Sequence, residues 1–179
     1  REASEILQSW RKAKGKQPCP MEKAGAIVQF DWSVGEVVRA LKEAGIFERT
    51  LIILSSDNGP VVDDGYADEA VARLKNHKPW GPLRGGKYST FEAGTRVPFI
   101  VHWPERVKAA TSPALVSQID MTATLARLVG AKNIADIPAD SRDQLPAWLG
   151  KDLKGREYVI GAGSSLTVLT PEWKYIEPS

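Results

Sequence analysis

The segment Leu51–Leu54 limits the fold of this chain more than any other feature. It reads Leu-Ile-Ile-Leu, follows Thr50, and shows no alternation of apolar and polar residues. A strand of this kind is typical of a parallel sheet covered by helices, because both of its faces must then be buried. We therefore predict a buried strand over Thr50–Leu54 within a layered α/β domain.

A long helix is predicted directly before this strand. Between Met21 and Ala44, apolar residues recur at spacings of three and four, which places them on one helical face. Gly45 fits a C-terminal cap. The residues of the apolar face are Ile27, Phe30, Val34, Val37, Val38 and Leu41. Helix, short turn and strand together make one αβ unit.

The other predicted elements are shorter, and one long loop separates them. That loop, Lys75–Arg96, is rich in Gly and Pro, and loops of this length are uncommon in compact domains unless they have a function. The last three strands would form a small antiparallel subdomain. We expect helices over Ser4–Lys16, over Asp63–Leu74 and from Met121 with Asp120 as cap and Gly130 as end, and strands over Val97–Trp103, Glu157–Ile160, Leu166–Leu169 and Lys174–Ile176.

The composition is that of an ordinary globular protein. The 179 residues are 42% apolar and 26% charged, and a chain of this length can bury a substantial core. The net charge is only +2, so we expect no nucleic-acid partner, and no apolar run approaches the ~20 residues of a membrane span. The single cysteine excludes an intrachain disulfide and a multi-cysteine zinc site.

Two oxygen donors, Asp57 and Asn58, follow the predicted strand almost at once. In open α/β sheets, ligands bind beyond the carboxyl ends of the strands. A carboxylate beside an amide oxygen suits a hard cation such as Ca²⁺ or Mg²⁺. Asp-Asn-Gly-Pro is also ordinary turn chemistry. The pair alone therefore leaves both a metal site and a plain turn open.

A lysine, Lys87, lies in the Gly-rich loop. The segment Gly81–Lys87 matches most of the phosphate-binding pattern Gly-x-x-x-x-Gly-Lys. Nucleotide binding is disfavoured, because the next residue is Tyr88 instead of the Ser or Thr that would hold Mg²⁺. No buried strand leads into the loop either. Two interpretations of Lys87 stay open: a cation that binds another anionic group, or a solvated surface charge.

Three segments in this order resemble the sulfatase family of the alkaline phosphatase superfamily: Leu51–Pro60, Pro82–Lys87 and Phe91–Pro98. The resemblance implies part of a layered α/β, alkaline phosphatase-like domain over 1–131, then a linker and a small C-terminal antiparallel β subdomain over 132–179. It implies that Asp57 and Asn58 are metal ligands for Ca²⁺ or Mg²⁺ and that Lys87 is a catalytic, sulfate-binding residue. A sulfated small molecule or glycan is the implied substrate.

The resemblance also implies parts of the enzyme that these residues do not encode. The nucleophile of the family is a formylglycine made within Cys/Ser-x-Pro/Ala-x-Arg, upstream and near two further aspartates, and no such motif is present. Cys19 does not supply one, because Met21 and Lys23 stand where the motif needs Pro or Ala and Arg. We therefore expect the missing N-terminal half of the same fold to be a partner, and the chain alone to be inactive. Family resemblance implies a periplasmic, secreted or lysosomal location, although no signal peptide is present.

The charged residues around the loop have less defined roles. Glu92 and Arg96 are four apart and of opposite charge, so we interpret them as a scaffold pair. Arg84 is either a loop anchor or a substrate contact. His77 could line the substrate pocket, whereas we interpret His102 as a packed histidine in a strand.

Two alternatives to a sulfatase stay open. A phosphodiesterase or phosphonate monoester hydrolase of the same superfamily would differ in its nucleophile and in its ester substrate. A non-catalytic sulfatase-like module would bind a ligand without any reaction. The presence of Asp57, Asn58 and Lys87 argues against the second alternative, because a site that has lost its activity has no physical need for them.

Overall fold

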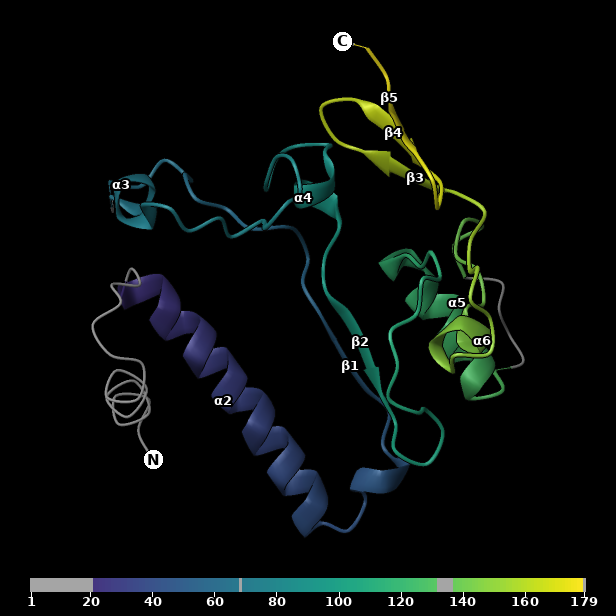
Figure 1. Cartoon of the computed structure of the whole chain (residues 1–179). Coiled ribbons are helices and arrows are strands. Elements are labelled where there is room, and N and C mark those ends of the chain that lie inside the picture. The colour runs from purple at the N-terminus through teal and green to yellow at the C-terminus, as the bar shows by residue number, and fades with distance from the viewer. Residues whose placement is uncertain (1–20, 68, 132–136, 179) are drawn as a thin grey trace.

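The protein is described by a computed structural model over residues 21–67, 69–131 and 137–178. The predicted helix Ser4–Lys16 and Cys19 lie outside these residues. Figure 1 shows a long helix on one side, a narrow two-stranded sheet in the middle, and short helices with a three-stranded sheet on the other side. The described elements are spread out in an extended arrangement.

Helix α2 spans Met21–Glu43 and confirms the long helix predicted from the apolar periodicity. Gly45 has a φ of 67°, and its N–H donates to the Lys42 carbonyl at 3.0 Å. The Ile46 N–H donates to the Leu41 carbonyl at 3.0 Å. This is a Schellman-type end, which favours glycine because the left-handed conformation is strained for other residues.

The predicted strand after α2 is present, but its neighbour is antiparallel. A 3₁₀ turn, η1 (Phe47–Arg49), leads into β1 (Ile52–Ser55). β1 pairs with β2 (Phe99–His102), in a register that runs from Ile52 opposite His102 to Ser55 opposite Phe99. All four β1 residues are half-buried. Parallel pairing and burial on both faces are therefore not found in the described residues, where β1 has a single neighbouring strand.

The middle of the chain is less helical than predicted. α3 covers only Ala70–Leu74, because Asp63 accepts the Gly65 N–H at 3.1 Å in a turn and Glu69 has a φ of 55°. The loop that follows contains one short helix, α4 (Glu92–Thr95). β2 confirms the strand predicted over Val97–Trp103.

The region after β2 forms a small helical layer. The 3₁₀ turn η2 (Gln118–Asp120) leads into α5 (Met121–Leu128), and Gly130 ends it with a φ of 66°. A further helix, α6 (Leu145–Trp148), was not predicted, because it is one turn long and contains Pro146. Trp148 from α6 is buried and packs against Phe99 with ring centroids 5.6 Å apart.

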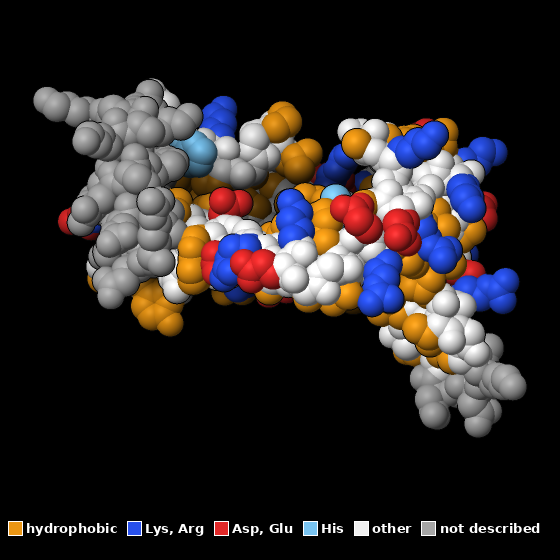
Figure 2. All heavy atoms as spheres, turned by 90° about the horizontal axis from the view of Figure 1, so that it is seen from below, with side chains coloured by type: hydrophobic (Ala, Val, Ile, Leu, Met, Phe, Trp, Pro, Cys, Tyr) orange, Lys and Arg blue, Asp and Glu red, His pale blue; other side chains and the backbone are white. Residues whose placement is uncertain are grey.

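Three short strands close the chain as predicted. β3 (Val159–Ala162), β4 (Leu166–Leu169) and β5 (Lys174–Ile176) form an antiparallel sheet in the order β3-β4-β5. Few apolar side chains are buried among the described residues, and Figure 2 shows hydrophobic side chains at the surface beside charged ones. Within the described part, no helix is both long and apolar enough to cross a bilayer.

Asp120 does not cap α5 with its side chain, contrary to the prediction. Its carboxylate is fully buried and accepts the Arg156 Nε–H at Oδ2, 2.7 Å away, and the Arg156 Nη2–H at Oδ1. Oδ1 also accepts the Arg142 backbone N–H at 2.9 Å. Arg156 further donates to the Asp140 carbonyl. This buried pair joins the start of α5 to the segment that precedes the terminal sheet.

Candidate functional site

The fold brings together the three segments that the sequence singled out. The Gly59 N–H donates to the Gly94 carbonyl at 3.0 Å, and the Lys87 N–H donates to the Pro60 carbonyl at 2.9 Å. The Ala93 N–H donates to the Arg84 carbonyl at 2.9 Å and joins the second segment to the third. We call this cluster of segments 57–60, 84–89 and 92–95 the loop junction. Its backbone bonds link residues that lie up to 35 positions apart in the sequence.

Glycines make this close approach possible. A Cβ at Gly59 would lie 1.6 Å from the Ala93 carbonyl oxygen. A Cβ at Gly94 would lie 2.2 Å from the Ser89 carbonyl oxygen and 2.5 Å from that of Gly86. Both contacts are with backbone atoms, which side-chain rotation does not relieve. The glycines are therefore required for packing at the junction.

We expect Gly59→Ala to destabilise the chain by at least ~1–3 kcal/mol, the scale of an overpacked site, because the α4 backbone must move. Gly35→Ala is a matched control, since Gly35 lies within α2 and a Cβ there meets nothing within 4 Å. The control should gain roughly 0.5–1 kcal/mol from helix propensity. Thermal melts of both variants measure the difference. An unchanged Gly59→Ala melt would show that the junction is not closely packed.

Asp57 and Asn58 lie just beyond the carboxyl end of β1. Asp57 is exposed, and its Oδ1 accepts the Asn58 N–H at 3.0 Å. The Asn58 side-chain amide donates to the Gly59 carbonyl at 2.8 Å, which orients the side chain. These bonds make a turn and at the same time leave Asp57 Oδ2 and Asn58 Oδ1 available as ligands.

The chemistry of this pair fits a hard cation, but only as part of a site. Carboxylate and amide oxygens are the donors that Ca²⁺ and Mg²⁺ prefer, and Ca²⁺ takes six to eight oxygen ligands. No group of three or more His, Cys, Asp or Glu residues that could hold a metal occurs in the described parts of the chain. Asp57 and Asn58 would therefore need further donors from outside these residues.

Lys87 lies in a tightly folded turn of the loop junction. Ser89 Oγ–H donates to the Gly86 carbonyl at 2.9 Å, and the Ser89 N–H donates to the same oxygen at 3.1 Å. The Lys87 side chain is half-buried, with Nζ 5.2 Å from the centroid of the Tyr88 ring. Tyr88 has a φ of 72°. Such strained conformations at non-glycine residues are concentrated at functional sites.

Side-chain contacts also stabilise the loop junction. Arg84 places its guanidinium carbon 3.8 Å from the Phe91 ring centroid, which is the contact of a loop anchor. Lys174 from β5 donates to Glu92 Oε1 at 3.1 Å and to Thr95 Oγ1 at 2.8 Å. The predicted pair of Glu92 with Arg96 is weaker, because the ions are 3.7 Å apart and the Arg96 side chain is 70% exposed.

Lys174 was not identified as part of the site by its sequence. It lies 82 positions from Glu92, and no local pattern signals a contact over that separation. The bond ties the terminal sheet to α4, so the C-terminal strands help to hold the junction in place.

The two histidines lie outside the junction. His77 is exposed in the loop after α3 and does not line the cavity described below. The His102 ring packs against Phe47 with centroids 5.2 Å apart, as expected of a packed histidine, although the residue stays exposed.

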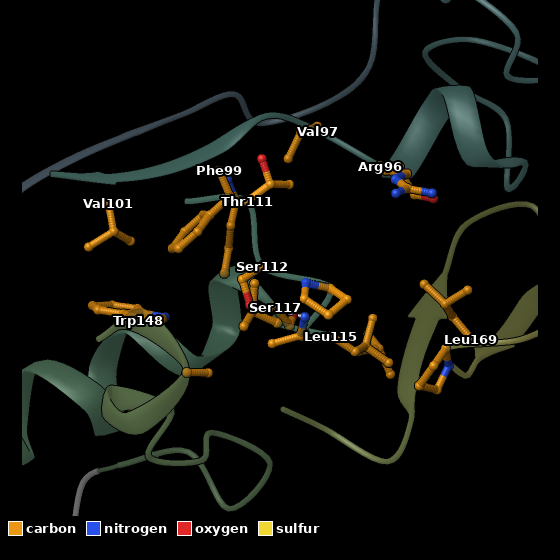
Figure 3. A pocket seen from close by; sticks show the side chains of 18 of the residues that line it. Arg96, Val97, Phe99, Val101, Thr111, Ser112, Leu115, Ser117, Trp148 and Leu169 are labelled. Carbon is orange, nitrogen blue, oxygen red and sulfur yellow. Dashed lines mark hydrogen bonds between the residues drawn. The ribbon is translucent and has the colours of Figure 1, made fainter. Parts of the chain in front are cut away.

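A cavity of about 940 Å³ lies beside the junction, between β2, the segment 107–118, α6 and the terminal sheet. Figure 3 shows its apolar end at Phe99, Val101 and Trp148, with Arg96 toward the opposite end. Asp57 lines it, whereas Asn58 and Lys87 do not. The cavity therefore adjoins the candidate site at Asp57 without containing the candidate catalytic lysine.

Most of the chain is similar to known proteins. The sulfatase family model matches residues 14–131, and the chain belongs to the sulfatase family. It shares the α/β, alkaline phosphatase-like fold of these enzymes, with a small antiparallel sheet at its C-terminus. Sulfatases are sulfuric ester hydrolases.

Individual members of the family show how similar the chain is to known sulfatases. It is 46% identical over 159 residues to an N-acetylgalactosamine-6-O-sulfatase of Bacteroides thetaiotaomicron. The aligned region covers 88% of this chain and 31% of that protein. It is 30% identical over 150 residues to human arylsulfatase A, over 84% of this chain and 27% of the relative. A solved structure, from work on the metabolism of multiple glycosaminoglycans by B. thetaiotaomicron, matches with a TM-score of 0.81 at 47% identity, over 87% of this chain and 33% of the other. The chain thus spans about a third of the length of these relatives.

Proposed function

We propose that this chain supplies the later part of a sulfatase active site, with Asp57 and Asn58 as ligands of Ca²⁺ or Mg²⁺ and Lys87 as the sulfate-binding catalytic residue. The observation that carries the proposal is the loop junction. The Lys87 N–H donates to the Pro60 carbonyl and so joins the loop of Lys87 to the turn of Asp57 and Asn58, and two further backbone hydrogen bonds attach the turn and the loop to α4. A site that needs a cation and a lysine around one anion requires such an arrangement.

Each part of the junction has a role in this proposal. Lys87 binds a sulfate oxygen and stabilises the negative charge that develops on the ester oxygen. Asp57 Oδ2 and Asn58 Oδ1 would hold the cation, while Asp57 Oδ1 and the Asn58 side-chain amide make the hydrogen bonds of the turn. The cation and the formylglycine of the remaining part of the enzyme would supply electrophilic activation and the nucleophile. The Lys174 bond to Glu92 positions α4.

We extend the proposal to the substrate class. The relative at 46% identity is named an N-acetylgalactosamine-6-O-sulfatase, so a glycan that carries a 6-O-sulfated amino sugar is the substrate we propose. Residues 1–131 would belong to the catalytic domain, and residues 132–179 would form the linker and the terminal sheet. A periplasmic, secreted or lysosomal location remains part of the proposal.

The test compares the chain alone with a complete enzyme in which it replaces the matching region of the B. thetaiotaomicron relative. We expect no turnover of a chromogenic aryl sulfate by the 179 residues alone, because they contain no formylglycine motif. The complete enzyme should hydrolyse the aryl sulfate and the 6-O-sulfated sugar. Turnover by the chain alone that Cys19→Ala abolishes would contradict the assignment.

The same assay separates the alternative reactions. Faster hydrolysis of a phosphonate monoester than of a sulfate ester by the complete enzyme would favour the phosphonate hydrolase. A complete enzyme that folds, binds Ca²⁺ and shows neither reaction would favour a non-catalytic module. Ca²⁺ binding by titration calorimetry, compared between Asp57 and its Ala variant, tests the metal ligand independently of turnover.

A further inference from the structure

We propose that Gln118 is a positioning residue for the metal ligands Asp57 and Asn58, and that it acts by holding the end of β1 from which these two residues extend. The inference rests on the proposed function, because it concerns the cation that Asp57 and Asn58 would hold. The Gln118 amide acts on the backbone that carries the two ligands.

The side chain of Gln118 bridges from η2 to the end of β1. Its Nε2 donates to Ser55 Oγ at 2.7 Å and to the Ser56 carbonyl oxygen at 2.7 Å. Both hydrogens of the amide nitrogen are therefore used. The Ser56 carbonyl belongs to the peptide bond that leads into Asp57, so the second bond holds the backbone directly before the ligand pair.

Side-chain bonds continue the attachment of this backbone where the strand pairing stops. The pairing of β1 with β2 ends at Ser55. The Ser55 hydroxyl, which accepts from Gln118, donates to the Pro98 carbonyl at 2.8 Å. The Ser56 hydroxyl donates to the Asn58 carbonyl at 3.0 Å. Within this small network, Gln118 connects the end of the sheet to the helical layer.

The element that carries Gln118 is held in place by other bonds. Asp120, two residues further along η2, is fully buried and accepts the Arg156 Nε–H at 2.7 Å. The Ile119 carbonyl accepts the Ser141 hydroxyl at 2.7 Å. A side chain that extends from a fixed element can hold its partner in one position. The buried ion pair therefore supports the metal ligands through Gln118.

A cation site is sensitive to support of this kind, because its ligand oxygens must lie at defined distances. Groups that orient metal ligands typically contribute about 10- to 100-fold to metal affinity. Ca²⁺ accepts flexible coordination, whereas Mg²⁺ requires nearly ideal octahedral geometry. Loss of the Gln118 amide should therefore weaken Mg²⁺ binding more than Ca²⁺ binding.

The experiment measures Ca²⁺ and Mg²⁺ affinity by titration calorimetry, without substrate, on the complete enzyme in which this chain replaces the matching region of the B. thetaiotaomicron relative. Gln118→Leu keeps the approximate size and removes both donors. We expect a fall in Ca²⁺ affinity of about 10- to 100-fold and a larger fall for Mg²⁺. Gln29→Leu is the matched control, since Gln29 is exposed on α2 and its side chain makes no hydrogen bond with the described residues. The control should leave both affinities unchanged.

Unchanged Ca²⁺ affinity of Gln118→Leu overturns the inference. Equal losses for the two ions also overturn it, because general destabilisation weakens both alike. If Gln118→Leu does not fold, Ser55→Ala takes its place, since this variant removes one of the two acceptors and adds no bulk. We expect a smaller loss with the same preference, and no loss for either ion would again contradict the role of Gln118.

Asp57→Ala separates this inference from the proposed function. If Asp57→Ala leaves Ca²⁺ affinity unchanged, the ligand assignment is wrong and the proposed function fails with it. If Asp57→Ala lowers Ca²⁺ affinity and Gln118→Leu does not, only the positioning role is wrong.

Discussion

Lys87→Ala in the complete enzyme is expected to lower kcat/KM by about 10²- to 10³-fold, the scale for loss of one preorganised charge-stabilising donor. Lys87 is half-buried at the loop junction, and the role we propose for it is to stabilise the charge that develops on the ester oxygen. Its backbone N–H bond to Pro60 survives the substitution. The melting temperature should therefore change little. Steady-state kinetics on an aryl sulfate and on the glycan, with melts of the same samples, measure both effects.

Lys78→Ala provides the matched control for this experiment. Lys78 is an exposed lysine of the same long loop, and its backbone carbonyl accepts the Gly81 N–H. Its side chain makes no hydrogen bond or ion pair with the residues that the structure describes. Its replacement should leave kcat/KM near the starting value. Near-full activity of Lys87→Ala would remove the catalytic assignment and leave the Gly-Gly-Lys segment as a structural turn.

Local patterns predicted much of the secondary structure. α2 and its glycine end follow from apolar spacing and the special conformation of Gly45, which are properties of neighbouring residues. The three terminal strands were predicted for the same reason. α3 was predicted too long because its charged residues have helical propensity, while the Asp63 side chain competes for a backbone N–H and forms a turn.

Non-local contacts account for what the sequence did not predict. The antiparallel partner of β1 lies more than 40 residues away, and a run of aliphatic residues does not specify the direction of its neighbour. The Lys174 bond to Glu92 and the Arg156 bonds to Asp120 also join distant segments. Asp120 was predicted to be a cap because it precedes a helix, but its pairing with a distant arginine determines its position.

The proximity of the three motif segments could be predicted only in part from the sequence. The order of Asp57, Lys87 and Glu92 was visible in the sequence, but their proximity was implied only by family resemblance. The structure adds the reason that they can approach, which is the absence of side chains at Gly59 and Gly94. Their roles in metal binding and catalysis remain proposals for the experiments above.

Arg156→Met is expected to destabilise the chain by about 3–5 kcal/mol, because it leaves the Asp120 carboxylate buried without its partner. Asp120 is fully buried, and the Arg156 side chain is 6% exposed. Hydrogen bonding to Asp120 raises the pKa of Arg156, so the guanidinium stays charged. For a chain of this length the loss corresponds to a fall in melting temperature of roughly 6–20 °C.

The double variant Asp120→Leu with Arg156→Met distinguishes a buried charge from simple loss of packing. Removing both ions should recover much of the stability, because no unpaired charge remains and apolar side chains fill the space. Arg39→Met is the matched control, since its pairs with Glu36 and Glu43 are exposed and such pairs contribute little. Thermal melts of the three variants show whether the loss of stability comes from the unpaired buried charge. If Arg156→Met melts like the starting protein, the buried pair does not stabilise the fold, and the attachment of the terminal sheet depends on Lys174 and the Leu115–Gly155 bridge.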